Sequence, residues 1–171
     1  MDQQLHERRR IFESAIEAYA DSMFRVAFRL SGDRELALEI VQETWLGAWK
    51  NIGQLRNRDQ LKSWLFGILR NQYLKSVDKL TRQPKLELID NMVSRSDGPN
   101  EMQQAVQQAI GELDDDQRMS VLLVSMEGWS TQEAADLLGV PQGTVLSRLH
   151  RGRQRLKEIL SRQLEFDTYS E

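Results

Sequence analysis

The sequence contains no cysteine and only two histidines, His6 and His150. Without thiols the chain forms no disulfide, no thiolate zinc or iron–sulfur site and no cysteine nucleophile. Because the two histidines are far apart, we also expect no metal site and no cofactor. The longest apolar runs are four or five residues, as at Val121 to Val124, too short to span a membrane. The N-terminus lacks the apolar core of a signal peptide, so the sequence predicts a cytoplasmic protein.

Charge is distributed unevenly along the 171 residues, whose formal net charge is −3. This acidic balance argues weakly against binding to nucleic acid. Residues 1–95 nevertheless hold 16 basic and 13 acidic residues, and residues 129–162 hold six basic and three acidic residues. The acidic excess lies between these blocks, at 96–128, and in the tail at 163–171. Two net-positive blocks around an acidic stretch indicate two modules.

Apolar residues recur at steps of three and four in the first block, which predicts three amphipathic helices. The stripes are Phe12, Ile16, Tyr19, Met23, Val26 and Leu30; then Ala37, Ile40, Val41, Thr44, Trp45, Ala48 and Trp49; then Leu61, Trp64, Leu65, Ile68 and Leu69. At this spacing we expect Trp45, Trp49 and Trp64 to be core residues. We expect Ser31 to Asp33 to separate the first two helices and Asp59 to cap the third.

Turn-forming residues then interrupt the helical pattern. Pro84 and the stretch from Ser94 to Pro99 indicate a flexible acidic linker at residues 83–101, with a short helix around 86–93 as one option. Helical periodicity resumes near Met102, and Asp114 to Asp116 can cap a helix that ends at Gly128. The predicted fold class is all-α: two small helical domains, residues 1–82 and 102–162, joined by a linker and followed by a tail at 163–171.

Residues 130–157 carry the most specific pattern. Ser130 and Glu133 form a capping box, Gly139 suits the left-handed position that ends a helix, and Pro141 can open the next helix. Ala135, Gly139 and Val145 have the relative spacing of a helix-turn-helix, in which a small residue, a tight turn and a buried anchor hold two helices crosswise. We therefore expect the C-terminal domain to be a helix-turn-helix.

The second helix of this motif is basic. It contains Arg148, Arg151, Arg153, Arg155 and Lys157, and no acid occurs from 139 to 157. Arginine pairs with guanine edges and with phosphates, so we expect the first exposed turns, with Gln142, Thr144, Ser147 and Arg148, to face a DNA groove. His150 is either a surface residue or a DNA contact. A helical hairpin with a solvated basic face is the alternative, but the caps, turn and charge together favour DNA binding.

Other distinctive stretches are Ile40 to Trp45, Trp64-Leu65 with Arg70-Asn71, Glu127 to Ser130, and Gly143 to Arg151. In this order they resemble the bacterial RNA polymerase sigma factors of the extracytoplasmic-function (ECF) group, the two-domain minimal class. The resemblance covers nearly the whole chain. It implies that residues 1–82 form sigma domain two and that residues 102–162 form sigma domain four.

The resemblance implies that domain two binds core RNA polymerase through its second helix, with Ile40, Val41, Glu43, Thr44 and Trp45. It also implies that this domain recognises and melts the promoter −10 element. There a base of the non-template strand would be flipped into a pocket formed by the connector before the third helix and by that helix. The residues concerned would be Leu55, Arg56, Asn57, Arg70, Asn71, Lys75 and Lys79.

Domain four would read the −35 element with Gln142, Thr144, Leu146, Ser147, Arg148, His150 and Arg151. The acidic linker would lie in the RNA-exit region of the polymerase, a basic channel meant for nucleic acid. Further expected partners are promoter DNA and an anti-sigma factor, with no membrane insertion. Three residues depart from the family: Leu146 where a basic residue is frequent, Lys75 where aspartate is frequent, and Gly47 where arginine is frequent.

The sequence therefore predicts an ECF-type sigma factor that directs promoter-specific initiation of transcription under the control of an anti-sigma factor. It predicts no enzyme, because nothing in the chain supplies catalytic machinery. A stand-alone helix-turn-helix regulator is the alternative; it would use residues 130–157 and leave the region of Asn71 without a role. The acidic linker and tail suggest a protein that binds DNA poorly alone and well only within a polymerase.

Overall fold

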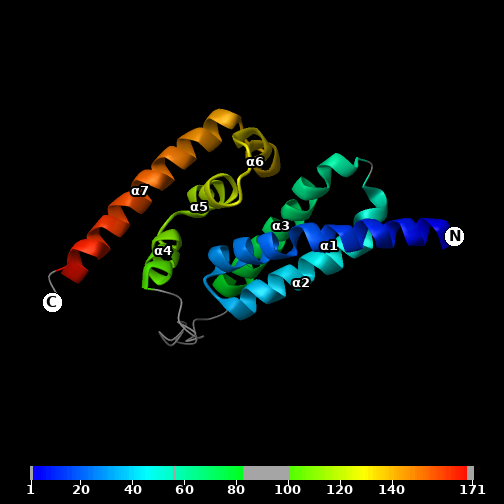
Figure 1. The fold of residues 1–171 in the computed structure, drawn as a ribbon, viewed down its shortest axis with the longest axis horizontal. Helices are drawn as coiled ribbons and strands as arrows, with labels where there is room; N and C mark the ends of the chain where they lie inside the picture. The colour runs from blue at the N-terminus through cyan, green and yellow to red at the C-terminus, as the bar shows by residue number, and fades with distance from the viewer. Residues whose placement is uncertain (1, 56, 83–100, 169–171) are drawn as a thin grey trace. The chain divides into compact units, whose positions relative to one another are not determined.

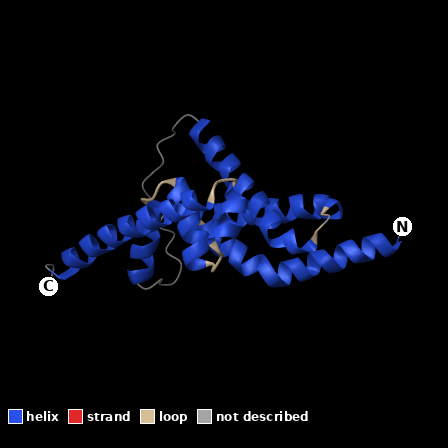
Figure 2. Cartoon of the chain, turned by 90° about the horizontal axis from the view of Figure 1, so that it is seen from above, coloured by secondary structure: helices blue, strands red, loops and turns tan. Residues whose placement is uncertain are grey.

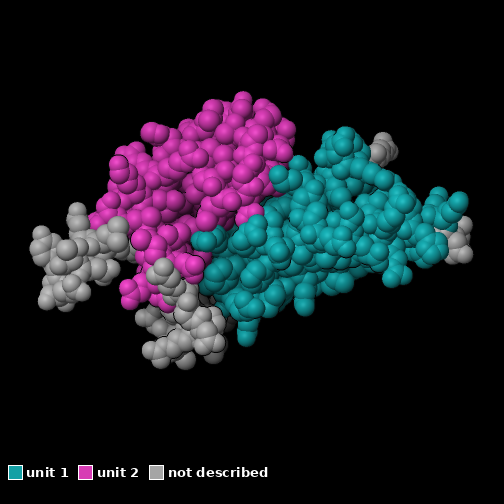
Figure 3. Space-filling model, in the orientation of Figure 1, with its two compact units in different colours: residues 1–90 teal, residues 91–171 magenta. Residues whose placement is uncertain are grey.

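The computed structural model describes residues 2–55, 57–82 and 101–168, and these residues form helices and turns without a strand (Figure 1, Figure 2). The all-α fold class is confirmed. The chain divides into two compact units, residues 1–90 (unit 1) and 91–171 (unit 2) (Figure 3). Of the expected linker, Glu101 belongs to a helix, while residues 83–100, with the optional helix at 86–93, lie outside the described residues.

Unit 1 consists of α1 (Asp2–Ser31), α2 (Arg34–Asn51) and α3 (Leu61–Arg82), each in contact with the other two. Two 3-10 turns, η1 (Ile52–Gln54) and η2 (Arg58–Gln60), lie in the connector between α2 and α3. The largest fully buried side chains of the unit are Met23, Val26, Leu65, Phe66, Leu69 and Thr44. The expected first stripe is wrong at Ile16, which is exposed because its neighbour Ala15 faces the core.

The turn between α1 and α2 is as predicted. Gly32 has a φ of 69°, a left-handed conformation that costs glycine little. Asp33 caps α2, and its Oδ1 accepts a hydrogen bond from the backbone N–H of Leu36 at 2.7 Å. The prediction that Asp59 precedes α3 as its cap is wrong: Asp59 lies inside the 3-10 turn η2. Asn57 caps that turn and accepts from the backbone N–H of Asp59 at 3.0 Å.

Unit 2 contains α4 (Glu101–Gly111), α5 (Asp115–Val121), the π-helical turn η3 (Leu122–Met126), α6 (Thr131–Leu138) and α7 (Gln142–Thr168). Helix α7 packs against α4, α5 and α6. Asp114 caps α5 as predicted, accepting from the backbone N–H of Gln117 at 2.8 Å. In η3 the backbone N–H of Glu127 donates to Leu122 O, five residues back, at 3.0 Å. Gly128, with a φ of 72°, then ends the segment as expected.

Arg118, the only basic residue between 96 and 128, joins α4 to α5. Its guanidinium donates to three backbone carbonyls, Ile110 O at 3.0 Å, Gly111 O at 2.8 Å and Leu113 O at 2.7 Å. These carbonyls lie at and just beyond the C-terminus of α4, where helical acceptors lack partners and a cation is favourable. The one cation of the acidic stretch therefore stabilises the turn inside unit 2.

Candidate nucleic-acid interface

The helix-turn-helix of unit 2 has the local geometry that the sequence predicts. Ser130 Oγ accepts from the backbone N–H of Glu133 at 3.1 Å, while Glu133 Oε2 accepts from the backbone N–H of Ser130 at 2.7 Å. Gly139 ends α6 with a φ of 65°. Pro141 immediately precedes α7, and its carbonyl accepts from the backbone N–H of Val145 at 3.3 Å. The two helices of the motif are therefore fixed at both ends of the turn.

Small and apolar residues bury the inner face of the motif. Ala134, Ala135, Val145 and Leu149 are all buried. Gly152, one turn further along α7, is also buried, and a Cβ added there would lie 2.8 Å from Val121 Cγ2. Helix α7 thus approaches α5 closely at a residue that the sequence reasoning missed. The available signal was a lone glycine inside a strongly helical basic segment.

The outer face of α7 presents most of the residues expected to read DNA. Gln142, Leu146, Ser147, His150 and Arg151 are exposed. Residues three and four apart lie on the same side of a helix, so 143, 146, 147, 150, 151 and 154 form a continuous outward stripe. Thr144 is half-buried, at the edge of this stripe. The N-terminal half of α7 therefore has a solvent-exposed, mostly polar surface that includes one glycine and one leucine.

Gln142 is held by the other helix of the motif. Its Nε2 donates to Oγ1 of Thr131, the first residue of α6, at 2.7 Å. This bond joins the N-termini of α6 and α7, although the two residues are 11 apart in sequence. It restricts the rotamers of Gln142, so that a ligand using this rotamer would lose less side-chain entropy on binding.

The expectation that Arg148 faces the groove is wrong in this structure. Its guanidinium turns back to α5 and donates to Asp116 Oδ2 at 2.6 Å, so that only 17% of the side chain is exposed. The physical reason is the helical period, because 148 is three residues from buried Val145 and shares its side of α7. Arg148 therefore joins α5 to α7.

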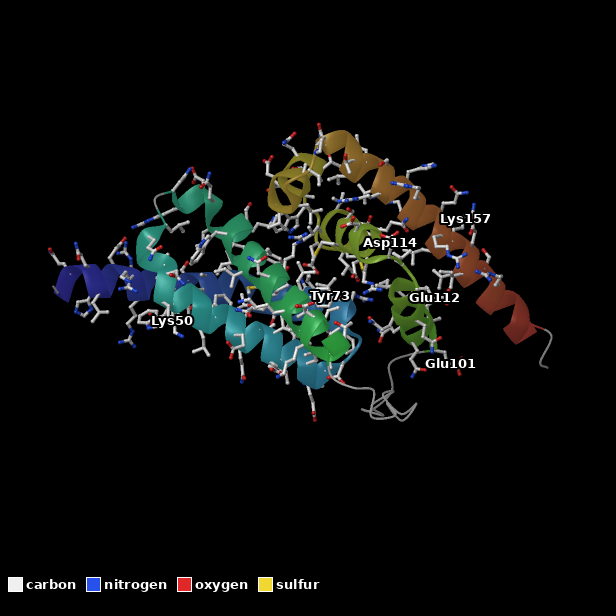
Figure 4. All side chains as sticks on the ribbon, turned by 180° about the vertical axis from the view of Figure 1, so that it is seen from behind. Lys50, Tyr73, Glu101, Glu112, Asp114 and Lys157 are labelled. Atoms are coloured by element: carbon white, nitrogen blue, oxygen red, sulfur yellow. The ribbon has the colours of Figure 1, made fainter. Side chains whose placement is uncertain are left out.

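Of the other cationic side chains of α7, some contact neighbouring residues of unit 2 and others point toward solvent. Arg153 donates to Ser125 Oγ at 3.1 and 2.9 Å, and Arg155 lies 3.8 Å from Glu112 and 3.6 Å from Glu158. Arg151 donates only along its own helix, to Ser147 O at 3.3 Å, and no ion pair holds it among the residues that the structure describes. Figure 4 shows Lys157 further along α7, and its side chain is exposed. Arg151 is thus the cation best placed to meet a phosphate.

In unit 1, Asn71, Lys75 and Lys79 are exposed and lie at steps of four on α3, along one side of the helix. Arg70 is half-buried and points about 100° away from Asn71, because each helical residue turns by that angle. The structure therefore brings three of the four predicted α3 residues together and separates Arg70 from them.

The connector places two more of the predicted residues near the start of α3. Leu55 is half-buried and Asn57 is exposed, while Arg56 lies outside the described residues. Trp64 is half-buried, seven residues before Asn71 and on the same side of α3. An apolar side chain and an amide thus lie on one exposed side of the helix. This is the combination that a flipped base needs as platform and reader.

Two of the residues expected to bind polymerase are inside the core. Ile40 is 2% exposed and Thr44 0% exposed, and Thr44 Oγ1 donates to Ile40 O at 2.7 Å. The apolar stripe on α2 already placed both residues on the inner face of the helix, and only the resemblance to sigma factors assigned them to a binding surface. Glu43 is exposed, and Val41 and Trp45 are half-buried. Leu46, which the sequence reasoning missed, is exposed beside them.

The prediction that Trp45, Trp49 and Trp64 are core residues is also wrong. Trp45 and Trp64 are half-buried, and Trp49 is 36% exposed. Phe12 of α1 lies against two of these rings, with centroids 5.6 Å from Trp45 and 5.1 Å from Trp49. Aromatic rings and Leu46 therefore form a partly exposed apolar patch along α2.

Among the described residues, no helix is both long and apolar enough to cross a membrane. Within the same ranges, no three or more His, Asp or Glu side chains lie together as metal ligands would. The exposed surfaces of α2, α3 and α7 remain the candidate sites.

Comparison with known proteins identifies the family. Residues 15–83 match the family described as Sigma-70 region 2, and residues 103–156 match Sigma-70 region 4. The ECF RNA polymerase sigma factor EcfG of Rhodopseudomonas palustris is 33% identical over 151 residues, covering 85% of this chain and 82% of EcfG. The chain belongs to the ECF RNA polymerase sigma factors. The sigma factor SigE of Mycolicibacterium smegmatis is 30% identical over 160 residues, or 88% of this chain and 62% of SigE.

A solved structure agrees with this assignment. The sigma factor RpoE, in complex with the anti-sigma factor NepR from Bartonella quintana, matches with a TM-score of 0.77 and 29% identity, covering 88% of this chain and 96% of RpoE. The predicted resemblance is thus confirmed. In this sigma factor the helix-turn-helix lies within the region 4 match, and α2, α3 and the connector lie within the region 2 match.

Proposed function

We propose that this ECF sigma factor binds core RNA polymerase and directs it to promoters, with unit 1 acting at the −10 element and unit 2 at the −35 element. The observation that carries the proposal is that the two regions occur in separate helical units, each with an exposed polar or basic helix face. The protein catalyses no covalent reaction and acts by binding alone, in the cytoplasm with the polymerase.

For the −35 element we assign the outward stripe of α7. Gln142, Ser147, His150 and Arg151 supply donors and acceptors that can reach base edges or phosphates, and Leu146 can contact a thymine methyl group. Thr144 contributes from the edge of the stripe. Arg148 acts through Asp116, by holding α7 against α5.

For the −10 element we assign one side of α3 together with the connector. Asn71 carries both donors and an acceptor, which suits reading the edge of an unpaired base. Lys75 and Lys79 follow on the same side for the backbone phosphates. Leu55, Arg56 and Asn57 complete this assignment from the connector, whereas Arg70 points about 100° away from Asn71 around α3.

For the polymerase we assign the partly exposed apolar patch of α2. Val41, Glu43 and Trp45 remain from the prediction, and Leu46 and Trp49 join them. Exposed leucine and tryptophan rimmed by charged residues are typical of a protein-binding surface. Ile40 and Thr44 support this face from inside the unit.

An anti-sigma factor is a further proposed partner. The structurally similar RpoE was solved bound to one. We propose that such a protein covers the polymerase-binding or DNA-binding surfaces of this chain until transcription from its promoters is required.

The function is tested by mixing the full chain with purified core polymerase and separating bound from free chain by gel filtration. We expect a stable complex that initiates at defined start sites, whereas the free chain binds the same DNA weakly. Failure to bind core polymerase, under conditions in which an established sigma factor binds, would contradict the proposal. Tight promoter binding without core would instead favour a stand-alone regulator.

Arg151→Ala is expected to weaken promoter binding by the polymerase complex, most strongly at low salt concentration. One phosphate contact fewer lowers the slope of log K against log salt by about one unit. The measurement is promoter affinity across a salt series. Arg155→Ala is the matched control, because it removes the same charge from α7 where acidic residues of unit 2 already hold it. An equal slope for Arg151→Ala and wild type would assign Arg151 to another role.

A further inference from the structure

The first turns of α1 contact the connector between α2 and α3. They precede the matched region, which begins at residue 15. Two consecutive residues of α1, Glu7 and Arg8, contact opposite ends of the connector. Both side chains are half-buried, whereas those of the next two residues of α1, Arg9 and Arg10, are exposed.

Arg8 holds the end of α2. Its Nη2 donates to Trp49 O at 3.1 Å, and its guanidinium lies 5.7 Å from the Trp49 ring centroid. Trp49 is two residues from the C-terminus of α2, where carbonyls lack helical partners and a cation is favourable. Phe12, one turn along α1, packs its ring edge against the same tryptophan. Arg8 is therefore fixed by a hydrogen bond, an aromatic ring and a helix end.

The same guanidinium covers the first turn of the connector. A Cβ added to Gly53 in η1 would lie 3.2 Å from Arg8 Nε and 3.4 Å from Arg8 Cζ. Glu7, the preceding residue, forms an ion pair with Arg58 in η2 at the other end of the connector. Adjacent residues of α1 thus bridge both 3-10 turns of one connector.

The connector has few other anchors. Ile52 is buried and Leu55 is half-buried, whereas the other described residues from 53 to 60 are exposed. A segment with one buried side chain samples many conformations unless contacts from outside restrict it. A site that reads a base needs supporting contacts that hold it close to its binding geometry.

We propose that Glu7 and Arg8 are positioning residues that hold the connector in the conformation that reads the −10 element. The inference rests on the proposed function of the connector and adds residues outside the matched region to that site. Neither residue needs to touch DNA. Arg8 is the stronger support, because it contacts a backbone carbonyl, the Trp49 ring and the turn at Gly53, whereas Glu7 reaches the connector through an exposed ion pair.

The first test compares Arg8→Ala with Arg9→Ala in the full chain. Arg9 is the matched control because it carries the same charge one residue away and pairs with Glu13 on its own helix at 2.7 Å. Each variant is assembled at saturating concentration with core polymerase, so that differences in core affinity do not enter. We expect Arg8→Ala to lower the rate of promoter opening about tenfold, the size of one lost hydrogen bond to a charged group. Arg9→Ala should remain close to the wild type.

A second readout separates positioning from general stability. The ratio of opening rates between a promoter and its variant with a substituted −10 base measures discrimination at that base. We expect Arg8→Ala to reduce this ratio and Arg8→Lys to restore part of it, since lysine keeps the cation near the end of α2. A slower rate with unchanged discrimination would overturn the proposal, as would equal behaviour of Arg8→Ala and Arg9→Ala.

The positioning role of Glu7 is tested by exchanging the charges of Glu7 and Arg58. Glu7→Arg should slow opening about twofold to fivefold, as expected for an exposed pair, and Glu7→Arg with Arg58→Glu should restore the rate. No restoration would overturn the assignment of Glu7. If the wild-type chain with core polymerase opens no promoter, that result contradicts the proposed function itself. The results for the Arg8 and Glu7 variants contradict only the positioning role.

Discussion

Gly152→Val is expected to lower the free energy of unfolding of unit 2 by about 3 kcal/mol, the upper end of the usual cost of overpacking a core. The first added carbon would lie 2.8 Å from Val121 Cγ2, with Gln117 Cβ at 3.5 Å and Gln117 O at 3.7 Å behind it. Valine is short and stiff, so it cannot swing away as a long side chain would. Helices α5 and α7 must therefore separate, and Val145 and Leu149 lose part of their packing.

Hydrogen exchange of α5 and α7 amides in the full chain measures this effect, because it reports unit 2 separately from unit 1. Gly143→Ala is the control, since an added Cβ at that residue of α7 meets nothing within 4 Å. It should stabilise the helix by up to about 1 kcal/mol. Adding Val121→Ala to Gly152→Val should recover part of the loss, because it removes the Cγ2 that the added carbon meets. Unchanged exchange in Gly152→Val would show that the close approach is absent in solution.

Asn71→Ala is expected to reduce the rate of open-complex formation about 10- to 100-fold while leaving the affinity for core polymerase unchanged. Stabilising an unstacked base requires a few kcal/mol, and every 1.4 kcal/mol corresponds to tenfold. Asn71 is exposed, so truncating it leaves the packing of α3 intact. The loss therefore belongs to the DNA-bound state.

Permanganate reactivity of unpaired thymines and a binding titration with core polymerase measure the two quantities separately. Gln72→Ala is the control, because it removes an amide from the neighbouring residue, on a different side of α3. It should open promoters at nearly the wild-type rate. If Asn71→Ala lowers core affinity as much as it lowers opening, Asn71 is a structural residue.

The features that sequence reasoning predicted correctly are local. The caps at Asp33, Asp114 and Ser130 each satisfy a backbone N–H three residues ahead, and Gly139 ends its helix in a left-handed conformation. Such features depend on a few consecutive residues, so the sequence carries them directly. Helical periodicity gave the fold class for the same reason.

The features that it missed depend on pairs of distant residues. Arg148 and Asp116 are 32 residues apart, and nothing near Arg148 in sequence indicates that its side chain pairs with α5. Gly152 is explained only by Val121 on another helix. Ile40 and Thr44 are buried, as their place in the apolar stripe indicates, and their assignment to a binding surface came only from the resemblance to sigma factors. The roles of the site residues in binding remain predictions.

The four tryptophans have a consequence for spectroscopy. Trp129 is 2% exposed and is the only tryptophan of unit 2, whereas Trp45, Trp49 and Trp64 belong to unit 1 and are all partly exposed. Collisional quenchers such as acrylamide should reach the three tryptophans of unit 1 and leave the blue-shifted emission of Trp129. A partner that covers α2 should protect Trp49 from quenching without altering the Trp129 signal. The chain thus contains its own separate optical reporters for its two units.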